Sequence, residues 1–202
     1  MPDDIQKLKK DLHAKDIKIR ELEDLIIEDP MTRLLNRRGF MELAKRIMGD
    51  VKWMKANPRA KREHYFVDSL TILFFDIDNF KKINDTFGHK VGDQVLKFVA
   101  SLIAEKVRAS DFVARFGGEE IVAALVGANE EDGAHKAEEI RRAIKSRVKI
   151  PKNPDHKVTV SVGVAEFDGK AALEELVKQA DKAMYKAKTS GKDRVVKSSV
   201  LV

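Results

Sequence analysis

Two apolar segments joined by a short glycine-containing turn constrain the fold most strongly. The segments are residues 111–116 and 121–126, and Gly117-Gly118-Glu119-Glu120 lies between them. Apolar runs of this length around such a turn predict a β-hairpin, and the glycines allow positive φ and close approach of the backbone. Both carboxylates then project from the tip of a sheet, where a metal ion or phosphate can reach them. A solvated hairpin with two surface acids is the alternative.

A second apolar run, residues 69–75, predicts a buried strand that ends in Asp76-Ile77-Asp78. Alternation along the strand puts Asp76 and Asp78 on one side and Ile77 on the other. A carboxylate at the end of a central strand is costly to bury unless it is paired or binds a metal ion. The alternative is a strand that ends in an ordinary Asp/Asn turn.

Composition limits the class of protein and of partner. The 202 residues are 43% hydrophobic and carry a net charge of +6, which favours anionic partners such as nucleotides, nucleic acid or acidic lipid without choosing among them. Cysteine is absent, so neither disulfides nor thiolate metal sites are available. No apolar run approaches the ~20 residues of a membrane span, and the N-terminus lacks a signal-peptide core. We therefore expect a cytoplasmic protein.

Residues 3–28 are predicted to form one charged helix, in which apolar residues recur every seven positions. Most of these positions hold a β-branched residue, and most positions three residues later hold Leu. This pattern favours a parallel two-stranded coiled coil, interrupted by Lys15. A single amphipathic helix lying on its own domain is the alternative. Pro30 then marks a boundary, because it disfavours helical geometry at Asp29. The expected domains are a coiled-coil signalling helix at 1–28 and a catalytic domain at 29–202.

The remaining pattern predicts helices that alternate with strands. We expect helices at 38–55, 80–87, 91–108, 130–148 and 171–188, strands at 158–164 and 194–196, a basic solvated insertion at 57–64, and a loop bracketed by Pro151 and Pro154. This order indicates an α+β fold with helices against a sheet.

Four ordered motifs resemble those of the GGDEF family, the diguanylate cyclases, in its Gly-Gly-Glu-Glu form. They are the hairpin turn 117–120, the segment 29–38 with Met31 in place of Leu, the segment 83–93, and the segment 185–194, in which Lys192 replaces Arg and Asp193 replaces Asn. The resemblance covers residues 29–197. It implies a palm-like (ferredoxin-like, nucleotidyl-cyclase) core with a central antiparallel sheet flanked by helices.

The resemblance implies that two GTP molecules are condensed into cyclic di-GMP and two pyrophosphates across a dimer of domains. Asp76, Glu119 and the Ile77 carbonyl are the expected ligands of Mg²⁺ (or Mn²⁺), with two ions per active half-site. Glu120 is either a further ligand or helps to deprotonate the attacking hydroxyl. Oxygen ligands suit Mg²⁺, and a pair of ions can activate a hydroxyl and hold a triphosphate.

Substrate residues follow from the same motifs. Asn84 and Asp93 are the expected guanine ligands, since a carboxylate can accept from guanine N1–H and N2–H₂. Lys188 and Lys192 are expected to bind phosphates, although Lys192 lacks the bidentate geometry of Arg. Lys81 and the backbone at Phe80 are secondary phosphate candidates.

Arg108 and Asp111 resemble the family's inhibitory product site, with Arg141 and Arg142 as candidates for a further arginine. The expected partners are GTP, cyclic di-GMP and a second copy of the chain, joined through the N-terminal helix. A GGDEF module that binds GTP or cyclic di-GMP without turnover is the runner-up. A nucleotidyltransferase acting on nucleic acid is disfavoured, because template-binding motifs and aromatic stacking series do not appear.

Overall fold

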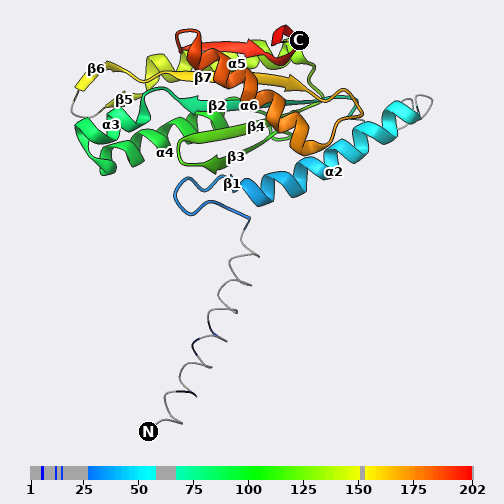
Figure 1. Ribbon diagram of the computed structural model, residues 1–202, viewed down its shortest axis with the longest axis horizontal. Coiled ribbons are helices and arrows are strands. Elements are labelled where there is room, and N and C mark those ends of the chain that lie inside the picture. Colours follow the sequence, from blue (N-terminus) through cyan, green and yellow to red (C-terminus); the bar gives the residue numbers. More distant parts are fainter. Residues whose placement is uncertain are drawn as a thin grey trace.

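The computed structural model describes residues 27–57, 67–150 and 153–201, together with the helical residues Gln6, Leu12 and Lys15. The predicted coiled coil therefore lies almost wholly outside the described residues, as does most of the basic insertion. Within the described part, helices pack on both faces of a six-stranded sheet (Figure 1). No helix of this part is long and apolar enough to cross a membrane.

The sheet has the strand order β1-β3-β4-β2-β7-β8. Its strands are β1 (Leu35–Asn36), β2 (Leu70–Ile77), β3 (Phe112–Gly117), β4 (Glu120–Val126), β7 (Val160–Glu166) and β8 (Arg194–Lys197). The four inner strands pair antiparallel, and the two short outer strands pair parallel to their neighbours. The expected α+β architecture with a central antiparallel sheet is confirmed.

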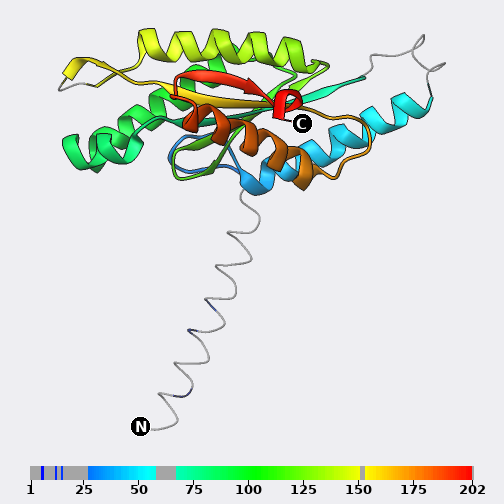
Figure 2. The same cartoon turned by 45° about the horizontal axis from the view of Figure 1, so that its top comes forward.

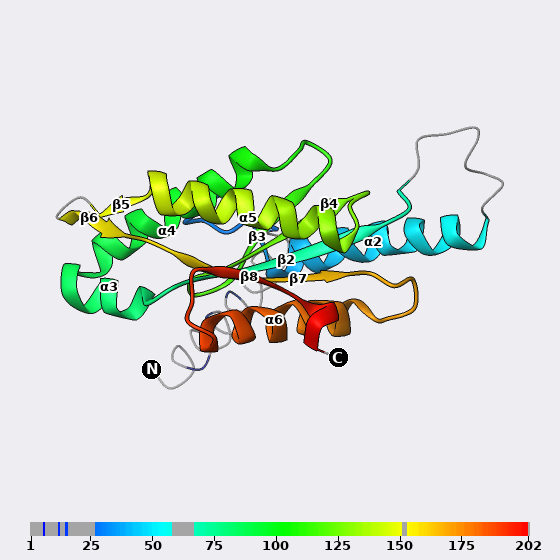
Figure 3. The same ribbon diagram turned by 90° about the horizontal axis from the view of Figure 1, so that it is seen from above.

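The described part of the domain also contains five α-helices: α2 (Arg37–Ala56), α3 (Phe80–Phe87), α4 (His89–Lys106), α5 (Glu130–Arg147) and α6 (Leu173–Thr189). Figures 2 and 3 show α6 on one side of the sheet and α4 and α5 on the other, and α2 contributes to the same core cluster as α6. A short 3-10 helix, η2 (Ser198–Leu201), follows β8. The bounds of the helices lie within two residues of those predicted.

Strand alternation divides the core into two clusters. Leu73, Phe75 and Ile77 of β2 face the cluster that includes α3, α4 and α5, whereas Leu70, Ile72 and Phe74 face the cluster that includes α2 and α6. Asp76 continues the second series, so its side chain lies on the side of α6. The alternation of side chains along β2 therefore determines that α6 can supply a partner for the buried carboxylate of Asp76.

The segment around Pro154 differs from its prediction. Residues 153–157 form a strand, β6 (Asn153–Lys157), which pairs with β5 (Lys149–Ile150), so Pro154 lies in a strand instead of a loop. Proline is tolerated there because a two-stranded ribbon consists only of edge strands. Asp78 follows the last residue of β2, and its carboxylate accepts from the hydroxyl of Ser161, the cross-strand partner of Asp76, which agrees with the expectation that both aspartates lie on one side.

Candidate active site

The carboxylate of Asp76 is the centre of the candidate site. It lies near the end of β2, is 4% exposed, and faces Glu120 across the β2–β4 pairing. Lys188 from the last turn of α6 contacts it, with Nζ 2.5 Å from Oδ2. Oδ1 is buried, and no hydrogen-bond donor of the described residues reaches it. An unpaired buried carboxylate oxygen is costly, and ligand binding is one way to satisfy it.

The hairpin is tighter than the sequence predicts. Gly117 pairs with Glu120, so only Gly118 and Glu119 form the loop, and Gly118 has a φ of 37°. Glu119 therefore lies at the tip, while Glu120 starts β4 and is the direct cross-strand partner of Asp76. Glu119 is thus not in direct register with Asp76, but both glutamates lie close enough to act on its charge.

Burial and like charges shift the pKa values of two of these acids. Burial, opposed by Lys188 and reinforced by Glu119 and Glu120, raises the pKa of Asp76 to about 6. Burial and the nearby carboxylates of Asp181 and Glu119 also raise the pKa of Glu120, while Lys188 and Arg37 oppose the shift. Raised carboxylate pKa values in one place indicate a site built to receive a positive charge.

The arrangement fits a divalent cation that brings other ligands with it. No three His, Asp or Glu side chains within the described ranges are grouped so as to hold a metal ion by themselves. Mg²⁺ is commonly bound through one or two carboxylates together with water and substrate phosphates. Asp76, with its unpaired oxygen, and Glu119 are therefore suitable residues for a metal ion that arrives with a triphosphate.

The two lysines expected to bind phosphates lie at either end of the loop that follows Asp76. Lys188 contacts Asp76, and Lys192 donates to Asn79 Oδ1 at 2.5 Å. Asn79 has a φ of 58° and precedes α3. Of the secondary candidates, Lys81 is exposed, whereas the Phe80 side chain is buried in the core, which leaves only its backbone for a ligand.

Asn84 on α3 and Asp93 on α4 are brought together by a glycine. A Cβ at Gly92 would lie 1.8 Å from Asn84 Oδ1, so the amide rests directly on the backbone of the residue before Asp93. Both polar side chains are half-buried. They come from helices joined at Gly88, where φ is 86°, and the turn places Asn84 against the start of the helix that carries Asp93.

Asp78, which sequence reasoning left without a role, is a structural acceptor. It is 3% exposed and accepts hydrogen bonds from the Thr159 and Ser161 hydroxyls, each at 2.7 Å, and from the Asp193 backbone N–H at 3.0 Å. Three donors satisfy this buried carboxylate. The two aspartates that flank Ile77 therefore differ: Asp78 is satisfied by hydrogen bonds within the protein, whereas Asp76 keeps one unpaired oxygen.

Arg115 joins the hairpin to the segment that begins the domain. Its Nε donates to the Gly118 carbonyl at 3.0 Å, and its Nη1 donates to Asp29 Oδ2 at 3.2 Å. Asp29 in turn accepts from the backbone N–H and the hydroxyl of Thr32, each at 2.8 Å. Sequence reasoning matched these motifs but did not predict that they meet.

Arg108 and Asp111 line a separate hollow of about 320 Å³ near the start of β3. Asp111 accepts from the backbone N–H groups of Arg108 at 2.9 Å and Val126 at 3.0 Å. His135 and Lys136 of α5 line the same hollow, whereas Arg141 and Arg142 line a different one, between α5 and β8. Neither Arg141 nor Arg142 lines the Arg108 hollow of its own chain.

Comparison with known proteins agrees with this geometry. The model of the GGDEF domain of diguanylate cyclases matches residues 26–194. The chain is 35% identical over 191 residues to the diguanylate cyclase DgcP of Pseudomonas aeruginosa, covering 95% of this chain and 27% of that protein. It is 37% identical over 168 residues to the diguanylate cyclase DosC of Escherichia coli, covering 83% and 34% respectively. The chain thus spans about a third of the length of these relatives.

Solved structures give the same result. The coiled coil and GGDEF domain of DgcB from Caulobacter crescentus, in complex with c-di-GMP, superposes with a TM-score of 0.75 at 28% identity, covering 96% of this chain and 98% of that one. The active GGEEF domain of a diguanylate cyclase from Vibrio cholerae gives a TM-score of 0.62 at 31% identity, covering 76% and 95%. The chain belongs to the GGDEF-domain diguanylate cyclase family.

Proposed function

We propose that this chain condenses two GTP molecules into cyclic di-GMP and two pyrophosphates. The observation that carries the proposal is the buried Asp76 carboxylate, which has one oxygen held by Lys188 and the other unpaired, beside a hairpin that supplies Glu119 and Glu120. When bound, two divalent ions per half-site, Mg²⁺ or Mn²⁺, would neutralise negative charge on the triphosphate and polarise the attacking hydroxyl.

The chain's own residues bind and orient the nucleotide. Asp93 accepts from the guanine N1–H and N2–H₂ groups, and Asn84 supplies an amide beside it. Lys188 and Lys192 bind the phosphates from both ends of the loop after Asp76. Asp76 and Glu119 would hold the metal, and the Ile77 carbonyl would serve as a backbone ligand. The raised pKa of Glu120 suits it to accept the proton of the attacking hydroxyl.

Each domain holds one GTP, so the reaction requires two domains that face each other. The 3′-hydroxyl oxygen of one GTP bonds to the α-phosphorus of the other, the bond to pyrophosphate breaks, and the same exchange in the opposite direction closes the ring. Proximity and orientation of the two domains then control the rate. We assign dimerisation to the N-terminal helix, because the structure of DgcB that covers 96% of this chain contains a coiled coil before its GGDEF domain.

Feedback inhibition by cyclic di-GMP is assigned to the Arg108–Asp111 hollow, where Arg108 contacts a phosphate or guanine of the product. No nucleic acid takes part in this reaction. The GTP pool that such an enzyme needs lies in the cytoplasm, which is where we place the chain.

Incubation with GTP and Mg²⁺, followed by nucleotide chromatography, tests the proposal. We expect cyclic di-GMP from the wild type, none from Asp76→Asn or Glu119→Gln, and wild-type amounts from Asp50→Asn, which removes an exposed acid of α2. Wild-type protein that binds GTP but leaves it unchanged would support the runner-up, a binding module without turnover. The departure of Lys192 from the family's Arg is the observation that favours that second reading.

A further inference from the structure

The turn between α6 and β8 carries two consecutive non-glycine residues in the left-handed conformation. Lys192 has a φ of 62° and Asp193 a φ of 47°, and they follow Gly191 at 113°. Left-handed geometry is unfavourable for residues with a Cβ, and it persists only where the surrounding contacts hold it. The contacts around this turn must therefore stabilise its left-handed conformation.

Asp193 makes most of those contacts. Its carboxylate pairs with Arg141 Nη1 and with Lys145 Nζ, the latter at 2.5 Å, both from α5. Its backbone N–H donates to the buried Asp78 at 3.0 Å. One residue of the turn is thus held from two sides, by a helix on one face of the sheet and by the end of β2.

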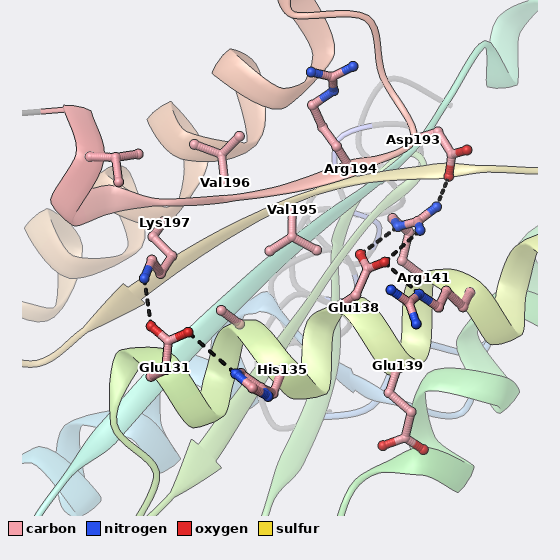
Figure 4. A pocket seen from close by; sticks show the side chains of 13 residues that line it. Glu131, His135, Glu138, Glu139, Arg141, Asp193, Arg194, Val195, Val196 and Lys197 are labelled. Atoms are coloured by element: carbon pink, nitrogen blue, oxygen red, sulfur yellow. Dashed lines mark hydrogen bonds and ion pairs between the residues drawn. The ribbon is translucent and has the colours of Figure 1, made fainter.

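Arg141 is itself held in a fixed orientation. Its Nε and Nη2 donate to the two carboxylate oxygens of Glu138, each at 2.7 Å, and its side chain is only 12% exposed (Figure 4). Two parallel hydrogen bonds fix the plane of a guanidinium group. The remaining nitrogen, Nη1, then points at Asp193, and the neighbouring Arg142 also pairs with Glu138 but not with Asp193.

Lys192 depends on the same turn for its position. Its backbone N–H donates to the Ala187 carbonyl at 3.0 Å, and its Nζ reaches Asn79 at the loop after Asp76. An ammonium group is a point charge on a flexible stem and lacks the planar fork of Arg. Its placement therefore depends on the backbone that carries it, as well as on its hydrogen bond to Asn79.

We propose that Asp193 is a positioning residue, whose pairs with Arg141 and Lys145 hold the left-handed turn so that the Lys192 ammonium meets the triphosphate. This inference rests on the proposed function, since it assigns Lys192 to the phosphates of GTP. It also explains why Asp follows Lys in this chain: the acidic side chain matches the two cations that α5 presents.

Asp193→Asn is the decisive variant, because it removes the ion pairs and retains the backbone donor. Simple electrostatics predicts that losing a negative charge near the phosphates tightens GTP binding, whereas positioning predicts weaker binding. We expect the Kd for Mg²⁺ with α,β-methylene-GTP, measured by calorimetry, to rise roughly five- to twentyfold. The KM for GTP should rise by a similar factor while kcat stays within about twofold, because the effect is on binding.

Two further variants make the test specific. Arg141→Met should reproduce the weaker binding, and Arg142→Met, which removes the adjacent arginine, should leave both constants unchanged. If Asp193→Asn fails to fold, as judged by circular dichroism, Arg141→Met carries the test. In a Lys192→Ala background, Asp193→Asn should have no further effect, since its action passes through Lys192.

Unchanged or tighter analogue binding in Asp193→Asn overturns the inference, as does a full effect in the Lys192→Ala background. Weaker binding in a protein that makes no cyclic di-GMP leaves the inference standing and refutes the cyclase. Normal cyclase activity with an unchanged KM in Asp193→Asn refutes the inference alone. Wild-type protein that does not bind the analogue refutes both.

Discussion

Replacement of Asp76 by Asn should stabilise the fold at neutral pH while it abolishes turnover. The pKa of Asp76 is raised from 3.8 to about 6, chiefly by burial. A shift of roughly two units at ~1.4 kcal/mol each is worth about 3 kcal/mol. Because the folded state holds its proton to higher pH than the unfolded state, the free energy of unfolding falls as pH rises from about 4 to about 6. Above about pH 6 the whole cost of burying the charged Asp76 carboxylate is present.

The assay is urea unfolding of the wild type and Asp76→Asn in buffer with EDTA, monitored by circular dichroism. The variant should be more stable by about 3 kcal/mol at pH 7.5, and this advantage should disappear near pH 4, where the wild-type carboxyl is protonated. Other titrating groups cancel in the difference between the two proteins. Asp50→Asn, at an exposed position, should give a small difference that does not change with pH.

An Asp76→Asn variant that is no more stable than wild type at pH 7.5 would refute the proposed cost of burying this charge. An advantage of the same size at pH 4 and pH 7.5 would also refute it, because the gain would then come from packing and not from charge. A positive result would place the energetic cost of the site on one carboxylate.

Three other variants test separate parts of the structure. Lys188→Met leaves a buried carboxylate without its cation, so the free energy of unfolding should fall by about 1–3 kcal/mol at pH 7.5. Lys186 is exposed on the same helix, and the free energy of unfolding of Lys186→Met should stay within about 0.5 kcal/mol of the wild-type value. Gly163→Ala places a Cβ 1.9 Å from the Ala180 carbonyl oxygen, so denaturant titration should show a loss of about 3 kcal/mol or more, while Gly49→Ala, with open space around its Cβ, should gain about 0.5–1 kcal/mol. Arg108→Ala should weaken cyclic di-GMP binding roughly tenfold or more and keep reaction progress curves linear for longer, with the melting temperature unchanged; inhibition equal to that of wild type would contradict the assignment.

Local patterns in the sequence predicted most of the fold. The hairpin at residues 111–126 and the buried strand before Asp76 follow from short-range periodicity and glycine placement, and the structure confirms both. The β5–β6 ribbon was missed because its first strand has two residues and its second contains Pro154. Such a ribbon gains little from strand propensity, so its sequence carries almost no signal.

The site was predictable in composition but not in its contacts. The motifs identified Lys188 and Asp76, yet the pair that joins them spans more than a hundred positions along the chain. The contact between Arg141 and Asp193, which are 52 positions apart, likewise depends on how α5 and β8 pack. Residue types and spacing cannot reveal such pairs, because they arise only when distant elements pack together.

The double contact of Arg115 has a practical consequence for anyone who fuses this domain to a different sensor. Its guanidinium reaches both Asp29 and the carbonyl of Gly118. A junction placed after residue 29 would delete an acceptor that helps to hold the catalytic turn, even though every motif of the sheet would remain. Chimeras should therefore be joined upstream of Asp29, and truncation series that begin later would measure a damaged hairpin instead of an isolated one.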